Sequence, residues 1–129
     1  MSWLWPAPAP KAAYTVLVLS EEKLGPVQSA FGPRYAYAFH HRGIVHRRLK
    51  QLDNALADQN AAIRLRPNYA DALNSRGNVW RDKKDFAKAA EDYSAAIKLF
   101  PQVVLYISNR AQAYEKLNDR DNAIAADVS

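Results

Sequence analysis

A fixed step of 34 residues runs through the central part of this chain. Gly43 is followed after this step by Gly77, and Pro67 is followed in the same way by Pro101. The same spacing links Ala55 to Ala89 and Ala123, Ala62 to Ala96, and Arg42 to Arg76 and Arg110. A period of this length is typical of a helical solenoid in which each unit is a hairpin of two helices. Such an array presents an extended surface and rarely a catalytic pocket.

The apolar pattern inside the first period predicts two helices joined by a short turn. Residues 34–50 contain no proline and show helical spacing of large side chains, so we expect one helix there. Asp53 is expected to cap the second helix by accepting backbone N–H bonds. Pro67 should end that helix, because proline lacks the N–H donor and clashes with the preceding turn.

The same pattern restarts twice. Helices are expected over residues 69–83 and 86–99, and the second of these should stop before Pro101. A third pass predicts a helix from about Val103 to Leu117, then a turn at Asn118–Asp119 and the start of a last helix at Asp121.

We therefore predict an all-α fold, a right-handed α–α superhelix of about two and a half to three helix-turn-helix repeats. Residues 1–33 are expected to be an irregular segment in which residues 26–32 form a short helix, a degenerate half-repeat that caps the array. The predicted repeat region covers residues 34–129, with units at 36–69 and 70–103 and a truncated unit at 104–129.

Composition excludes several classes of function. The chain has no cysteine, so it has no disulfides, thiolate metal sites or cysteine nucleophiles. No apolar stretch is long enough to span a membrane, and the N-terminus lacks the pattern of a signal peptide, so a cytoplasmic location is expected. The net charge is +5, with a local excess of +4 in residues 36–69. This modest excess favours an acidic protein partner over nucleic acid.

No set of residues in the sequence has the spacing of a catalytic or metal site. His40 and His41 are adjacent, so on a helix they point about 100° apart, and no carboxylate has the spacing of a metal-binding helix. The Ser, Asp and His residues follow no known triad order, and no Gly-rich phosphate loop is present. We therefore expect no enzyme activity, no bound metal and no cofactor.

The repeated residues make the chain similar to tetratricopeptide repeat proteins. The 34-residue unit of that family carries bulky, small and aromatic residues on its first helix, then Ala, an aromatic residue and Ala on its second, and a closing Pro. The unit at 70–103 matches throughout, whereas the unit at 36–69 has His46 and Gln59 where aromatics are expected. The matching residues are Leu73, Gly77, Trp80, Ala89, Tyr93, Ala96 and Pro101 in the second unit, and Ile107, Ala111, Tyr114 and Ala123 in the third.

Small residues at the repeated positions have a physical reason. Gly77 in the middle of a helix costs about 1 kcal/mol relative to Ala. Close approach of two helices, to roughly 8–10 Å, is the expected compensation. A bulky side chain at this position should therefore open the hairpin.

The resemblance implies a protein–protein interaction scaffold that binds a peptide or partner segment in a concave groove. In such arrays the first helix of each hairpin faces the groove. Amide side chains can donate to and accept from a peptide backbone, and arginines can pair with an acidic partner. The residues expected in the groove are Tyr37, His40, His41, Ile44, Arg47, Arg48, Asn74, Asn78, Arg81, Ser108, Asn109 and Gln112.

Two other functions stay open on the sequence. The incomplete third repeat leaves one side of its hairpin poorly covered, which would suit stacking into a homo-oligomer. An RNA-binding repeat would need exposed aromatics along a basic groove, and Tyr37 is the only aromatic among the expected groove residues. The period-spaced Arg42, Arg76 and Arg110 are expected to lay their alkyl stems across a neighbouring helix, with a basic stripe as the alternative.

Overall fold

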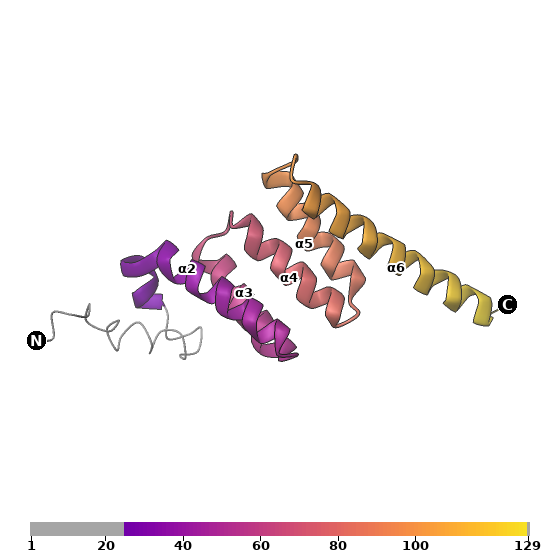
Figure 1. The fold of residues 1–129 in the computed structure, drawn as a ribbon, viewed down its shortest axis with the longest axis horizontal. Helices are drawn as coiled ribbons and strands as arrows, with labels where there is room; N and C mark the ends of the chain where they lie inside the picture. Colours follow the sequence, from indigo (N-terminus) through magenta and orange to yellow (C-terminus); the bar gives the residue numbers. More distant parts are fainter. Residues whose placement is uncertain (1–24, 129) are drawn as a thin grey trace, which may run out of the picture.

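The computed structural model describes residues 25–128 of the chain, and the side chains of residues 34–120. Within that part the chain forms five helices and no strand, so the predicted all-α fold is confirmed (Figure 1). The helices are α2 (Gly25–Arg48), α3 (Leu52–Leu65), α4 (Ala70–Asp82), α5 (Phe86–Leu99) and α6 (Val104–Val128).

The first helix begins earlier than the sequence predicts. α2 runs without a break from Gly25 to Arg48, so residues 26–32 form the first part of α2 and not a separate short helix. Pro26 lies in the first turn, where the missing N–H has no intrahelical partner to lose. The rest of the predicted N-terminal segment, residues 1–24, lies outside the described residues.

Proline ends α3 and α5 as predicted. The residue before each proline is extended: Arg66 has φ −142° and ψ 90°, and Phe100 has φ −137° and ψ 86°. The proline ring disfavours the helical conformation of the residue that precedes it, so each helix stops one residue earlier.

Both hairpin turns contain a lysine in the left-handed region, Lys50 with φ 64° and Lys84 with φ 69°. Asp85 then caps α5, since its carboxylate accepts a hydrogen bond from the Lys88 backbone N–H at 3.1 Å. The predicted cap at Asp53 is wrong. The residue that precedes α3 is Gln51, which makes no side-chain cap bond, and Asp53 instead accepts from Lys83 Nζ at 2.6 Å.

The predicted turn at Asn118–Asp119 is also wrong, because α6 continues through it to Val128 (Figure 1). A continuous helix keeps its backbone hydrogen bonds, whereas a turn breaks several of them. That loss is offset only when the returning helix buries an apolar face.

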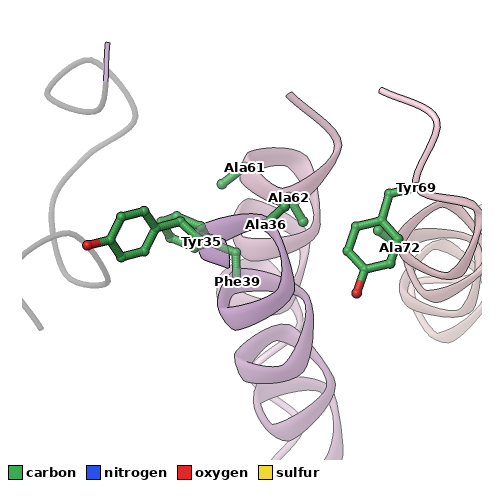
Figure 2. Close-up of a cluster of buried hydrophobic side chains, with 7 residues drawn as sticks. All are labelled: Tyr35, Ala36, Phe39, Ala61, Ala62, Tyr69 and Ala72. Atoms are coloured by element: carbon green, nitrogen blue, oxygen red, sulfur yellow. The ribbon is translucent and has the colours of Figure 1, made fainter. Parts of the chain in front are cut away.

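The apolar contacts are arranged in series along the array, as expected for a solenoid. Each helix packs mainly on its neighbours, α2 on α3, α3 on α4, α4 on α5 and α5 on α6. The first buried cluster joins α2, α3 and the start of α4 (Figure 2). A second joins α4, α5 and α6, and a third joins α5 and α6. The clusters comprise Tyr35, Ala36, Phe39, Ala61, Ala62, Tyr69 and Ala72; Ala70, Leu73, Ala96 and Tyr106; and Ala89, Ala90, Tyr93 and Ala113.

The two glycines of the period lie where helices approach most closely. A Cβ on Gly43 would be 2.5 Å from Gln59 Nε2, and a Cβ on Gly77 would be 2.6 Å from Tyr93 Cε1. Real Cβ atoms do not tolerate such distances, because they fall inside the van der Waals radii. The expected close packing of each hairpin is therefore confirmed at both positions.

Two of the three repeated arginines, Arg42 and Arg76, form ion pairs inside the hairpins, which corrects both readings of these two residues from the sequence. Arg42 binds Asp58 with two nitrogens, at 2.9 and 2.6 Å. Arg76 binds Asp92 in the same way, at 2.8 and 2.7 Å, and also donates to Asn60 at 3.0 Å. Each pair is separated by 16 residues and joins the two helices of one hairpin. The planar guanidinium forms two-point contacts of this kind with a carboxylate, and they are stronger than neutral hydrogen bonds.

The third repeat shows its predicted inward residues on the outside. Ile107, Ala111 and Tyr114 are exposed, because no returning helix covers them in the part of the chain that the structure describes. The side of α6 that packs on its neighbours instead carries Tyr106 and Ala113, both buried.

Candidate functional site

The first helices of successive hairpins, α2, α4 and α6, form one connected surface, here called the α2–α4–α6 surface. Three side-chain hydrogen bonds join these helices across the repeats, each about one period apart. They run from Arg47 Nε to Asp82 Oδ2 at 2.7 Å, from Tyr106 OH to Asp71 Oδ1 at 2.5 Å, and from Asn109 Nδ2 to Asn74 Oδ1 at 3.0 Å.

These bonds use several residues that the sequence places in the groove. Asn74 and Asn109 are buried and joined by one hydrogen bond, in which Asn109 is the donor, and Arg47 is held by Asp82. Burial and the hydrogen bond to Asp71 raise the pKa of the Tyr106 phenol, so this link stays protonated near neutral pH. The polar groups of these residues thus fix the spacing of the three helices.

His40, another predicted groove residue, is buried against Gln59. His40 Nδ1 donates to Gln59 Oε1 at 2.9 Å, and Gln59 Nε2 donates back to the His40 carbonyl at 2.9 Å. This reciprocal pair explains why the first repeat departs from the aromatic pattern at Gln59, which is fully buried. Burial lowers the pKa of His40 more than the bond with Gln59 raises it, and His41 lowers it further.

We expect the free energy of unfolding to fall as the pH drops below about 6.5, the ordinary pKa of histidine. The lowered pKa of His40 means that the unfolded chain takes up a proton that the folded chain resists, so acid favours unfolding. Thermal melts between about pH 8 and about pH 5 should show this slope, and His40→Asn should flatten it. The variant His41→Asn at the exposed neighbour is the matched control and should keep most of the slope, because burial is the largest cause of the lowered pKa of His40. An equal slope in both variants would contradict the assignment.

Six of the predicted residues, Arg47 among them, line two hollows on the α2–α4–α6 surface. The smaller hollow, about 140 Å³, takes Ile44, Arg47, Arg48 and Asn78. The larger, about 530 Å³, takes Arg81 and Gln112. The remaining three, Tyr37, His41 and Ser108, are exposed and line neither hollow. Tyr37 and His41 lie against each other, with ring centroids 4.1 Å apart.

The larger hollow lies where the α2–α3 turn and the α4–α5 turn meet α6. Its apolar part is formed by Leu52 and Phe86. Of its two acidic residues, Asp82 is already bonded to Arg47, which leaves Glu115 against a ring of basic groups. The basic residues are Lys50, Arg81, Lys84 and Lys116. The lining of the hollow therefore combines two apolar side chains with a surplus of positive charge.

Sequence reasoning missed four residues of this hollow, although the signal was present. Lys50 and Lys84 are one period apart, and so are Leu52 and Phe86. They were overlooked because the prediction considered only the first helix of each hairpin. The turn places them beside that helix, and the left-handed lysines are part of the turn itself.

Among residues 34–120, no group of three His, Asp or Glu side chains is placed to hold a metal ion. Within residues 25–128, none of the helices combines the length and the apolar character needed to cross a lipid bilayer.

Comparison with known families agrees with the geometry. Family models of the tetratricopeptide repeat match residues 36–69 and residues 70–103, which together make up more than half of the chain. A search of curated proteins found no match. Tetratricopeptide repeats mediate contacts between proteins and are typically non-enzymatic scaffolds. On these two matches and on its serial hairpins, the chain belongs to the tetratricopeptide repeat family.

Proposed function

We propose that the chain binds an acidic, extended segment of a partner protein along the α2–α4–α6 surface. One apolar side chain of that segment would occupy the larger hollow, against Leu52 and Phe86. The observation that carries the proposal is the composition of this hollow, in which two apolar side chains and four basic residues share the lining. A buried apolar anchor supplies most of the affinity at such sites, and charge around it selects the partner and speeds association.

The cross-links between helices support the proposal. Arg47 with Asp82, and Asn74 with Asn109, hold the three first helices in place before any partner arrives. A surface that is already ordered loses less conformational entropy on binding. The smaller hollow continues the same surface and adds the exposed Arg48, a second point for an acidic side chain.

A phage-displayed library of random peptides tests the proposal with the full chain as bait. The selected peptides should be rich in Asp and Glu around one large apolar residue. For a synthetic copy of the strongest binder, Arg81→Glu with Lys116→Glu in the chain should weaken binding at least about tenfold in fluorescence anisotropy. These two residues were chosen because neither makes a cross-link described above.

The matched control is Arg34→Glu with Lys98→Glu, which changes the net charge equally at exposed positions outside the hollows. It should bind the peptide nearly as well as the unchanged chain. Peptides without acidic residues, or equal loss in both double variants, would contradict the proposal. Circular dichroism should show unchanged helicity throughout.

The alternatives have less support on this surface. RNA binding would need stacked bases, and Tyr37 is again the only aromatic among the predicted groove residues. Self-association would use the outer side of α6, and its test is part of the experiment described in the next section. The cytoplasmic location stays a prediction.

A further inference from the structure

The outer side of α6 exposes residues whose counterparts in the preceding repeats are buried or half-buried. Ile107 is 41% exposed, whereas Phe39 and Leu73, which hold the same place in the first two hairpins, are 2% and 7% exposed. Tyr114 is 49% and Val104 74% exposed. We call this set the open face of α6, and it comprises Val104, Ile107, Arg110, Ala111 and Tyr114.

The two complete hairpins show what covers the equivalent face. There, α3 lies over α2 and α5 lies over α4, with Gln59 against Gly43 and Tyr93 against Gly77. In the part of the chain that the structure describes, no helix takes this place over α6, because α6 runs straight on to Val128. The helices α3 and α5 therefore show what kind of helix would fit the open face.

Charge adds a requirement on that helix. Arg42 and Arg76 each bind an aspartate of the covering helix with two nitrogens. Arg110 holds the same place on α6, and its hydrogen bond among the described side chains goes to Ser94 Oγ at 3.1 Å. The residue 16 positions after Arg110 is Ala126, so the chain has no aspartate there. A helix that covers α6 should therefore bring its own carboxylate.

Shape adds a second requirement. The covering helices place Gln59 and Tyr93 so close to Gly43 and Gly77 that a Cβ would fall 2.5 or 2.6 Å away. Ala111 has that Cβ. A covering helix with a large residue at this height would clash with it, so a small residue must follow the carboxylate.

We propose that the open face of α6 binds a helix of a second protein, antiparallel to α6, with a carboxylate for Arg110 followed by a small residue over Ala111. The helices α3 and α5 share the pattern Ala-x-x-Asp-Gln/Tyr-x-x-Ala, at residues 55–62 and 89–96. The partner pattern is the same with a small residue in place of Gln or Tyr. This surface is separate from the α2–α4–α6 surface, so the two proposals stand independently.

A synthetic peptide with the sequence of residues 85–100 and Tyr93→Ala is the probe, with a helix staple on its outer side because short isolated helices are marginal in water. It should bind the full chain in fluorescence anisotropy. Asp92→Asn in the peptide should weaken binding about tenfold. The peptide that keeps Tyr93 should bind weakly to the chain, and Ala111→Gly in the chain should restore its binding.

A charge swap identifies the contact. Arg110→Glu in the chain should abolish binding, and Asp92→Lys in the peptide should recover it. The peptide substitutions leave the chain unchanged, so they remain decisive even if a chain variant folds poorly. Absence of binding, equal binding of all peptides, or binding that ignores Arg110 would overturn the proposal. Sedimentation that shows a dimer of the unchanged chain, and a monomer for Arg110→Glu, would also overturn it and assign the face to a second copy.

Discussion

Gly77→Leu should lower the free energy of unfolding by about 3 kcal/mol or more. Even a Cβ at this position would lie 2.6 Å from Tyr93 Cε1. Tyr93 cannot move aside easily, because it is fully buried and its hydroxyl donates to Asn78 Oδ1 at 2.6 Å. The added side chain must therefore separate α4 from α5. Urea unfolding followed by circular dichroism measures the loss.

Two companion variants locate the cause. Gly77→Leu combined with Tyr93→Ala should recover part of the stability, since removal of the ring makes room for the leucine. Gly43→Ala should cost less than Gly77→Ala, because the atom it meets first is the amide end of Gln59 and not a ring. An unfolding midpoint of Gly77→Leu equal to that of the unchanged chain would show that the helices do not approach this closely.

Asp92→Ala is the second large effect we expect, a loss of about 3 kcal/mol. The Asp92 side chain is only 8% exposed and accepts two bonds from Arg76, whose own side chain is 26% exposed. Without Asp92 the guanidinium of Arg76 stays partly buried. Of the hydrogen bonds described for it, only the one to Asn60 remains. The cost comes mainly from this uncompensated charge, and urea unfolding again measures it.

The chain offers a matched control for this ion pair. Asp53 accepts from Lys83 at a similar distance, 2.6 Å, but its side chain is 90% exposed. Asp53→Ala should leave the unfolding transition where it is, because water screens exposed pairs. The double variant Arg76→Met with Asp92→Leu should lose less than Asp92→Ala alone. If Asp92→Ala resembled Asp53→Ala, burial would have no bearing on the strength of the pair.

The parts of the fold that follow local rules were predictable from the sequence. Pro67 and Pro101 stop their helices through steric effects on the preceding residue, and Gly43 and Gly77 mark close contacts by their lack of a Cβ. The turn at Asn118–Asp119 was not predictable in this way. Its local residues suit a turn, but a turn is stable only when the returning helix has enough apolar surface to bury, which is a tertiary property.

The candidate site also has a part that could be predicted from the sequence and a part that depends on tertiary contacts. The resemblance to the repeat family predicted that the first helices face the groove, and Arg48, Arg81 and Gln112 line hollows beside those helices. The burial of Asn74 and Asn109 depends on each other across one period, so neither residue alone reveals it. Several polar side chains that the sequence predicts to bind a partner are thus hydrogen-bonded to other residues of the fold.

The serial packing of the helices has a consequence for how such a chain can change in length. Because each helix packs mainly on the next helix along the chain, and otherwise only within the same or the adjacent repeat, no single centre has to be rebuilt when a unit is gained or lost. A duplicated unit of 34 residues would pack, on each side, against a repeat of the same kind as the original unit does. This architecture can therefore lengthen by duplication of a repeat, whereas a protein with one enclosed core cannot.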